Sequence, residues 1–168
     1  MAAAPDGLLL EFGTGAGGSA RRFAERTPRP LWTFDWFLGL PETWDQWDQA
    51  GAFTQFGEIP KVPDHVHVVA GMLQLTLPLF LRRHVEPVAF VHFDLDLYSS
   101  TSFALMTIHQ RFAHGAILLF DEMLGRPRNL EHEGKAFCEF LRATNYAAEY
   151  LGQMHGESAI FRLLTAPA

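Results

Sequence analysis

Several features that define other protein classes are missing from this 168-residue chain. It has one cysteine, Cys138, which excludes an internal disulfide and a zinc site built from cysteines. We expect Cys138 to be a small core side chain rather than a nucleophile. No apolar run reaches the roughly 18 residues that a membrane span needs. The first seven residues lack the basic region and apolar core of a signal peptide. We therefore expect a cytoplasmic protein without a membrane contact.

The chain also lacks an excess of positive charge. Its formal net charge of −6 at pH 7 disfavours a nucleic-acid-binding surface, so we expect no nucleic-acid partner. The hydrophobic content of 48% and the charged content of 19% are ordinary for a globular protein. A chain of this length suits one domain with one core, and we expect residues 1–168 to form a single domain.

Apolar strand candidates alternate with helical ones along the chain. This order predicts an α/β fold: a doubly wound, mostly parallel, seven-stranded Rossmann-like sheet that ends in an antiparallel hairpin. The predicted strands are 7–12, 31–35, 66–70, 90–93, 116–120, 147–154 and 158–164. The predicted helices are 20–26, capped by Ser19, then 76–84, opened by Thr76 and Pro78, then 101–114, ended by Gly115, and 133–144.

Residues 36–64 are irregular and rich in Trp, Gly, Pro and acids. A loop of this length is uncommon inside a compact domain unless it is functional. Its aromatic side chains could form a substrate wall, or they could pack internally or against a second copy in a homodimer. These aromatic residues are Trp36, Phe37, Trp44, Trp47 and Phe53.

Two of the predicted strands end in pairs of acids. Asp94 and Asp96 follow the fourth strand, and Asp121 and Glu122 follow the fifth. Ligands of open α/β sheets bind at this carboxyl edge. Clustered carboxylates repel one another unless a cation or shared protons relieve them. We therefore predict a metal-assisted site, with turn caps or solvated strand ends as the alternatives.

A glycine-rich loop lies between the first strand and the first helix. Gly13-x-Gly15-x-x-Gly18 is typical of a loop that lets the backbone approach a nucleotide cofactor. Asp35, which ends the next strand, could accept hydrogen bonds from ribose hydroxyls. Dinucleotide folds generally have an apolar residue where this chain has Glu11. A carboxylate there suits the positive charges of S-adenosylmethionine and would repel a pyrophosphate, so S-adenosylmethionine fits better than NAD.

Longer segments of the chain carry a family resemblance. They are Glu11-Phe12-Gly13 with Gly17 and Ser19, Phe34-Asp35-x-Phe37-x-Gly39-Leu40-Pro41-Glu42, His92-x-Asp94-x-Asp96-Leu97-Tyr98-x-Ser100-Thr101 and Phe120-Asp121-Glu122. Together they resemble the macrocin O-methyltransferase family, class I S-adenosylmethionine enzymes that methylate hydroxyls, often on sugars of natural products. The resemblance covers about residues 8–164, and a more distant similarity to catechol O-methyltransferase supports the same arrangement.

The resemblance implies a role for each matching position. The acceptor would be a small-molecule hydroxyl on a sugar or another diol. Residues that would contact S-adenosylmethionine are Glu11, Gly13, Gly15, Gly17 and Ser19, with Asp35 at the ribose and Gly71 and Met72 at the adenine. Residues that would hold a divalent ion, Mg²⁺, are Asp94, Asp121 and Glu122. Asp96 would be the general base, beside Asp94 in the catalytic centre.

Two features depart from the family pattern. Family members commonly have Asp-Asp-Tyr where this chain has Asp121-Glu122-Met123, so Glu122 is a less secure ligand than Asp121. They also commonly have helices before the first strand that cover the active site, and here only about seven residues precede it. We expect the covering elements to be missing, shortened or supplied by another chain or domain. An NAD-type oxidoreductase and a non-catalytic cofactor-binding module remain the alternative functions.

Overall fold

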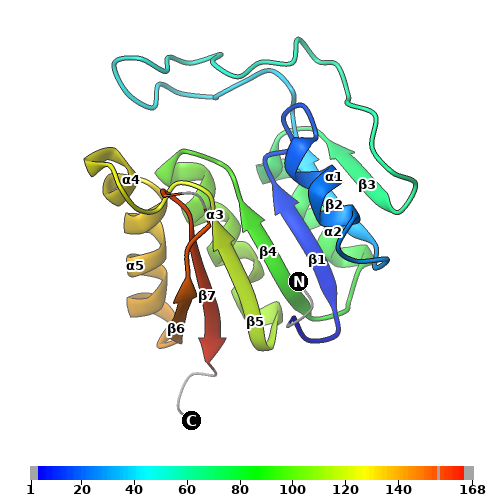
Figure 1. Ribbon diagram of the computed structural model, residues 1–168, viewed down its shortest axis with the longest axis vertical. Helices are drawn as coiled ribbons and strands as arrows, with labels where there is room; N and C mark the ends of the chain where they lie inside the picture. Colours follow the sequence, from blue (N-terminus) through cyan, green and yellow to red (C-terminus); the bar gives the residue numbers. More distant parts are fainter. Residues whose placement is uncertain (1–3, 155, 165–168) are drawn as a thin grey trace.

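The structure is a computed structural model that describes residues 4–154 and 156–164. Strands and helices alternate along most of it (Figure 1). The strands are β1 (Leu8–Phe12), β2 (Leu31–Asp35), β3 (Val66–Ala70), β4 (Val88–Phe93), β5 (Phe112–Phe120), β6 (Ala147–Gly152) and β7 (Ala159–Leu164). The helices are α1 (Gly18–Ala24), α2 (Leu73–Arg83), α3 (Tyr98–Ile108), α4 (Pro127–Glu131) and α5 (Glu133–Thr144), with a 3-10 turn, η1 (His109–Arg111).

The strands form one seven-stranded sheet in the order β3-β2-β1-β4-β5-β7-β6. Neighbours from β3 to β5 are parallel, whereas β7 is antiparallel to β5 and β6 is antiparallel to β7. This confirms the predicted doubly wound, mostly parallel sheet with an antiparallel C-terminal hairpin. The strand order reverses between β1 and β4, and α/β sheets bind ligands in the crevice at such a reversal.

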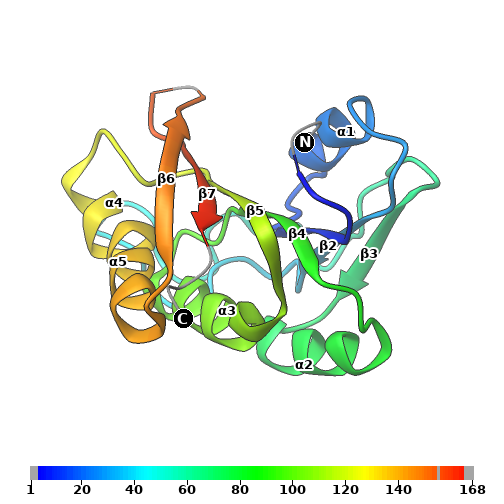
Figure 2. The same cartoon turned by 90° about the horizontal axis from the view of Figure 1, so that it is seen from below.

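Alternating side chains give the sheet two apolar faces. Helices α2, α3 and α5 cover one face of the sheet (Figure 2). This face carries four buried rings, those of Phe12, Phe34, Phe93 and Phe120. Each ring belongs to the last apolar residue before a strand end. The residues that follow these rings are Gly13, Asp35, Asp94 and Asp121. The buried aromatic layer therefore holds four predicted site residues at one edge of the sheet.

The second and third predicted helices begin earlier than expected. Helix α2 begins at Leu73, so Pro78 lies inside it. Leu77 and Phe80 from the same helix are buried in the core, and this burial outweighs the hydrogen bond that Pro78 cannot donate. Helix α3 begins at Tyr98 rather than near Thr101.

Two further predictions, about where helices begin and end, were wrong. Gly115 does have a left-handed φ of 75°, but it lies within β5, where the pairing with β4 is irregular, rather than at a helix end. Ser19 lies inside α1, whose N-cap is Gly17, and it gives no side-chain cap. In both places the glycine's freedom to adopt a positive φ decides where the chain bends.

Cys138 is exposed, so the prediction that it is a core residue was wrong. Helix α5 is amphipathic, and Phe137 and Phe140 occupy its buried face while Cys138 lies outside that face. Within the described residues, none of the helices has the length and apolar character required to cross a bilayer.

Residues 36–57, called the crossing segment below, are irregular as predicted but are held by backbone hydrogen bonds. The Leu40 amide donates to the Ala52 carbonyl at 2.9 Å, and the Gly51 amide returns to the Leu40 carbonyl at 2.8 Å. The Gly57 amide donates to the Phe37 carbonyl at 2.9 Å. In Figure 1 this segment leaves β2 and passes above the carboxyl ends of the strands toward α4. It therefore roofs the edge where the acids lie.

Candidate functional site

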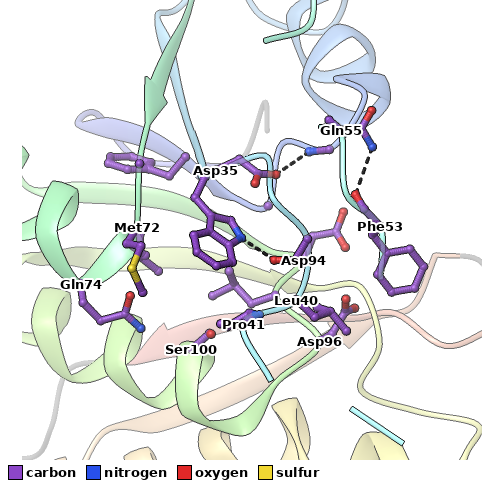
Figure 3. A pocket seen from close by; sticks show the side chains of 18 of the residues that line it. Asp35, Leu40, Pro41, Phe53, Gln55, Met72, Gln74, Asp94, Asp96 and Ser100 are labelled. Carbon is purple, nitrogen blue, oxygen red and sulfur yellow. Dashed lines mark hydrogen bonds between the residues drawn. The ribbon is translucent and has the colours of Figure 1, made fainter. Parts of the chain in front are cut away.

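A pocket of about 390 Å³ lies beneath the crossing segment at the carboxyl ends of the strands. Its walls come from the glycine loop after β1, the crossing segment, the turn after β3 and the acidic turn after β4. In Figure 3, Met72 and Gln74 lie on one side, while Phe53 and the carboxylates of Asp94 and Asp96 lie on the other. The size is typical of a site for a nucleoside-sized or drug-sized ligand.

The glycine loop is tied to Asp35. The amides of Thr14 and Gly15 donate to its Oδ2 at 3.0 and 2.8 Å, and the Phe37 amide donates to its Oδ1 at 2.7 Å. Asp35 also lines the pocket, as do Gly13 and Gly15. The Asp35 carboxylate therefore links the loop to the crossing segment as well as facing the ligand space.

Gly13 is where the loop touches the acidic turn. Its φ is 94°, and a Cβ at this position would lie 1.8 Å from the Asp94 carbonyl oxygen. The Asp94 amide donates to the Phe12 carbonyl at 2.9 Å, which continues the pairing of β1 with β4 past the strand ends. Only glycine allows this contact between the two parts of the site.

Glu11 lies beneath the loop and is not among the described residues that line the pocket. Its side chain is fully buried: Thr33 donates to Oε2 at 2.6 Å, and His92 Nδ1 lies 3.1 Å from Oε1. The Thr33 hydroxyl is also 2.6 Å from the hydroxyl of Thr14, which belongs to the glycine loop. Glu11 is therefore connected to the loop through Thr33. In this structure Glu11 occupies a supporting position, and its counter-charge is His92.

The other predicted cofactor residues divide into two groups. Gly71 and Met72 line the pocket, at the turn that follows β3. Gly17 and Ser19 lie at the start of α1 and are not among the described residues that line it. The prediction that Gly17 and Ser19 contact the ligand directly therefore has no geometric support here.

The acids after β4 are half-buried at the floor of the pocket. Burial, above all, raises the pKa of Asp94 from 3.8 to about 7. Burial, with the nearby carboxyls of Glu122 and Asp94, raises the pKa of Asp96 to about 9. Asp96 also has a positive φ of 61°, a conformation that aspartate tolerates better than most residues. The two side chains thus form a concentrated, incompletely ionised acid group.

The acids after β5 turn in different directions. Glu122 lines the pocket and interacts with Asp96, and its Oε2 is buried with no hydrogen-bond partner among the described residues. Asp121 has a half-exposed side chain with Oδ1 at 3.8 Å from His92 Nε2, and it is not among the pocket-lining residues described. Burial would lower the pKa of His92, but Asp121 and Glu11 outweigh that effect and raise it to about 10.

Glu133 is a further carboxylate at the site that the sequence reasoning missed. It is buried in the first turn of α5, where it accepts the Leu95 amide at 3.4 Å and the Glu122 amide at 3.2 Å. It therefore joins the turn after β4 to the turn after β5. Burial raises its pKa to about 8.

The predicted metal ligands were Asp94, Asp121 and Glu122. Within residues 4–154 and 156–164, no group of three or more His, Cys, Asp or Glu side chains is arranged to hold a metal ion. A shared cation would have to compete with His92 for Asp121 and with Asp96 for Glu122. The donors are all oxygens, as Mg²⁺ prefers, but they do not converge in this arrangement.

Comparison with known protein families decides the class. The sequence model of a family described as "Methyltransferase domain" matches residues 10–123, which is more than half of the chain. The chain belongs to this methyltransferase family. The match runs from β1 through both acidic turns, and it favours a methyltransferase over the alternative of an NAD-type oxidoreductase. A search of curated proteins finds no match for this methyltransferase.

Solved structures show the same fold as this methyltransferase. The calicheamicin methyltransferase CalS11 is 23% identical with a TM-score of 0.74, over 94% of this chain and 72% of that one. The O-methyltransferase NovP is 18% identical with a TM-score of 0.73, over 95% and 73%. TomG from Streptomyces achromogenes, an O-methyltransferase solved in complex with SAM, is 18% identical with a TM-score of 0.63, over 98% and 74%.

The roof of the methyltransferase pocket is fastened by Arg128, a residue that the sequence reasoning did not single out. Its guanidinium lies 3.7 Å above the Trp44 ring, and Nη1 lies 2.5 Å from Asp45 and 3.3 Å from Asp48. A second contact holds the crossing segment: the Ser99 hydroxyl in α3 donates to the Glu42 carboxylate at 2.5 Å. Arg128 thus anchors the far end of the crossing segment to α4.

We expect Arg128→Ala to loosen the crossing segment. The variant loses both ion pairs and the ring contact, so amides 44–48 should exchange with deuterium at least about tenfold faster, equivalent to about 1.4 kcal/mol of local stability. Hydrogen exchange followed by mass spectrometry measures this. Arg126→Ala is the matched control, because the ion pair of Arg126 is with Glu157, at 2.7 Å, rather than with Asp45 or Asp48. Equal protection of 44–48 in both variants would contradict the anchoring role.

We expect the ligand-free methyltransferase to become less stable as the pH rises. Folding raises the pKa of Asp94 to about 7, of Glu133 to about 8 and of Asp96 to about 9. Between the ordinary carboxyl pKa of about 4 and these raised values, the folded state binds more protons than the unfolded state, so stability falls as the pH rises from about 4 to 9. Thermal unfolding should give a Tm about 5 °C lower at pH 9 than at pH 6. Asp96→Asn should reduce this difference, and a Tm that rises with pH would contradict the assignment.

Proposed function

We propose that the protein is an S-adenosylmethionine-dependent O-methyltransferase that acts on a hydroxyl of a small molecule. The observation that carries this proposal is the contact between Gly13 and the Asp94 backbone, which joins a cofactor-type loop to an acidic floor within one pocket. Membership of the methyltransferase family supports it. So do the described O-methyltransferase activities of NovP and TomG and the SAM bound by TomG.

The cofactor would lie along the pocket from the turn after β3 to the acidic turn. Its adenine would lie by Gly71 and Met72, its ribose by Asp35, and its methionine end against Gly13 and Gly15. Glu11 would support the loop through Thr33 and Thr14 rather than touch the ligand. Met72 lies on one side of this pocket and the carboxylates of Asp94 and Asp96 lie on the other (Figure 3), which suits a ligand with one flat end and one cationic end.

Asp96 would act as the general base. Methyl transfer from a sulfonium is a displacement that needs donor, methyl carbon and acceptor oxygen in line, so positioning supplies much of the acceleration. A base works best when its pKa is near the working pH, and the elevated pKa of Asp96 meets that condition once the cofactor's positive charge lowers it somewhat. Asp94, on the same floor, would add negative charge that attracts the cationic donor.

A divalent ion, Mg²⁺, is part of the same proposal. Asp94, Asp121 and Glu122 would hold it; their oxygen donors and the buried Glu122 Oε2 suit a hard cation, although the side chains must turn from Asp96 and His92 to meet it. Such an ion, when bound, supplies positive charge that lowers the pKa of a hydroxyl. Asp121 would then exchange its ion pair with His92 for the metal.

We further propose a sugar hydroxyl or another diol as the acceptor, as the resemblance to macrocin O-methyltransferases implies. A cytoplasmic location and a homodimer belong to the same proposal. The exposed aromatic residues of the crossing segment support self-association, because Trp47 and Phe56 are 79% and 86% exposed.

Transfer of a radiolabelled methyl group from S-adenosylmethionine to a panel of catechols and sugar diols tests the proposal. We expect labelled product in the presence of Mg²⁺ and much less with a chelator. Binding of S-adenosylhomocysteine without transfer to any diol would favour the non-catalytic binding module. Failure to bind S-adenosylhomocysteine would remove the proposed activity.

A further inference from the structure

A row of polar side chains crosses the sheet beneath the glycine loop. The strand register pairs Glu11 in β1 with Thr33 in β2 on one side and with His92 in β4 on the other. All three side chains are buried. Each is followed along its strand by a phenylalanine of the aromatic layer, so the row lies on the opposite face of the sheet from that layer.

The row departs from the apolar pattern of its own face. Two positions earlier on the same three strands are Leu9, Leu31 and Phe90, which belong to one buried apolar cluster. A buried ion pair such as that of Glu11 with His92 is often no more stabilising than well-packed apolar side chains of similar volume. Stability of the fold alone therefore does not account for a charged pair at this level of the sheet.

Thr33 connects the row to the glycine loop. Its hydroxyl donates to Glu11 Oε2 at 2.6 Å and lies 2.6 Å from the hydroxyl of Thr14. The backbone amides of Thr14 and Gly15 hold the Asp35 carboxylate, which lines the pocket. One buried threonine thus ties the pocket wall to a buried carboxylate.

His92 connects the row to the acidic turn after β5. Its Nδ1 lies 3.1 Å from Glu11 Oε1, and its Nε2 lies 3.8 Å from Asp121 Oδ1. Ionised carboxylates offer only acceptors, and an imidazolium has one N–H for each of them. The Phe23 ring packs edge-on against the imidazole, with 5.1 Å between the centroids. A ring held on three sides passes a displacement of Glu11 on to Asp121.

We propose that this row is a relay that couples occupancy of the glycine loop to the orientation of the Asp121 carboxylate, with His92 as the positioning residue. Coupling between two sites is reciprocal, so a change at Asp121 alters the affinity at the loop, and a ligand at the loop alters the surroundings of His92. The inference rests on the proposed function, which places the cofactor at the loop and Asp121 at the acidic end of the site. It adds how the two ends act on each other.

A double-mutant cycle on S-adenosylhomocysteine affinity, measured by calorimetry with a chelator present, tests the relay without turnover or metal. We expect Thr33→Val to weaken binding about fivefold, the size of one hydrogen bond, and Asp121→Ala to weaken it about threefold. The double variant should bind about fivefold more weakly, because the loss of the Thr33 hydroxyl already isolates Asp121 from the loop. Effects that multiply to about fifteenfold, or no effect of Asp121→Ala, would overturn the inference.

Glu122→Ala is the matched control in the same turn. Glu122 interacts with Asp96 rather than through His92, so its effect on affinity should multiply with that of Thr33→Val. Thermal unfolding shows whether each variant is folded. Thr14→Val cuts the same link at its loop end and should reproduce the cycle, which keeps the test decisive if Thr33→Val does not fold.

The histidine ring gives a second measurement, one that a merely structural role would not move. His92 is buried and is not among the described residues that line the pocket. Saturation with S-adenosylhomocysteine should shift the ring NMR signals of His92 in the wild-type protein and much less in Thr33→Val, with His92→Gln identifying the signals. Unshifted signals in the saturated wild-type protein would overturn the relay.

These measurements separate the relay from the function on which it rests. If the wild-type protein does not bind S-adenosylhomocysteine, the proposed function fails and the relay fails with it. If it binds but the effects of the Thr33 and Asp121 variants multiply, the proposed function stands and only the relay is wrong.

Discussion

Asp96→Asn is expected to lower the rate of methyl transfer by about 10²- to 10⁴-fold, the contribution typical of a positioned base. The amide keeps the shape of the side chain but cannot take a proton from the acceptor. Because Asp96 lies on the acceptor side of the pocket, the affinity for S-adenosylhomocysteine should stay within about threefold of the wild-type value, a change below 1 kcal/mol. Steady-state kinetics and calorimetry measure the two quantities.

Asp64→Asn is the control for this variant, because Asp64 is exposed and is not among the described residues of the pocket wall. It should leave both quantities unchanged. Retention of full turnover by Asp96→Asn would show that another group accepts the proton. A large loss of cofactor affinity would instead place Asp96 on the cofactor side.

Gly13→Ala is expected to damage both halves of the site at once. The added methyl would collide with the Asp94 carbonyl, and the backbone at φ 94° is strained for alanine, so the β1 and β4 turns must separate. Overpacking of this kind costs about 1–3 kcal/mol or more, and we expect S-adenosylhomocysteine affinity to fall at least about tenfold with a lower Tm.

Gly18→Ala is the matched control. A Cβ on Gly18 meets nothing within 4 Å, its φ is not in the left-handed range, and it lies in the first turn of α1. This change should leave binding intact and slightly favour the helix. Normal binding by Gly13→Ala would contradict the close contact between the loop and the acidic turn.

The sequence allowed the edge of the sheet to be predicted because its signals are local. A run of buried-type residues that ends in an acid indicates a strand end, and parallel strands bring such ends together. Four residues selected by that reasoning line one pocket: Asp94, Asp96, Gly13 and Asp35. It could not predict which way each acidic side chain points, because the Asp121 carboxylate is oriented by its ion pair with His92 on the neighbouring strand.

The residues that the sequence reasoning missed act over long separations. Glu133 reaches the amides of Leu95 and Glu122, and Arg128 reaches Asp45 across more than 80 positions of the chain. No local pattern marks either residue as part of the site. The motif likewise did not reveal the buried partners of Glu11, which are Thr33 and His92.

Calorimetric titration with S-adenosylhomocysteine and, separately, with NADH tests most directly whether the glycine loop and the acidic floor form one methyl-donor pocket. We expect saturable binding of one S-adenosylhomocysteine per chain, weakened at least about tenfold in Gly13→Ala and kept in Asp96→Asn, with no heat from NADH. Saturable NADH binding without any response to S-adenosylhomocysteine would contradict the account.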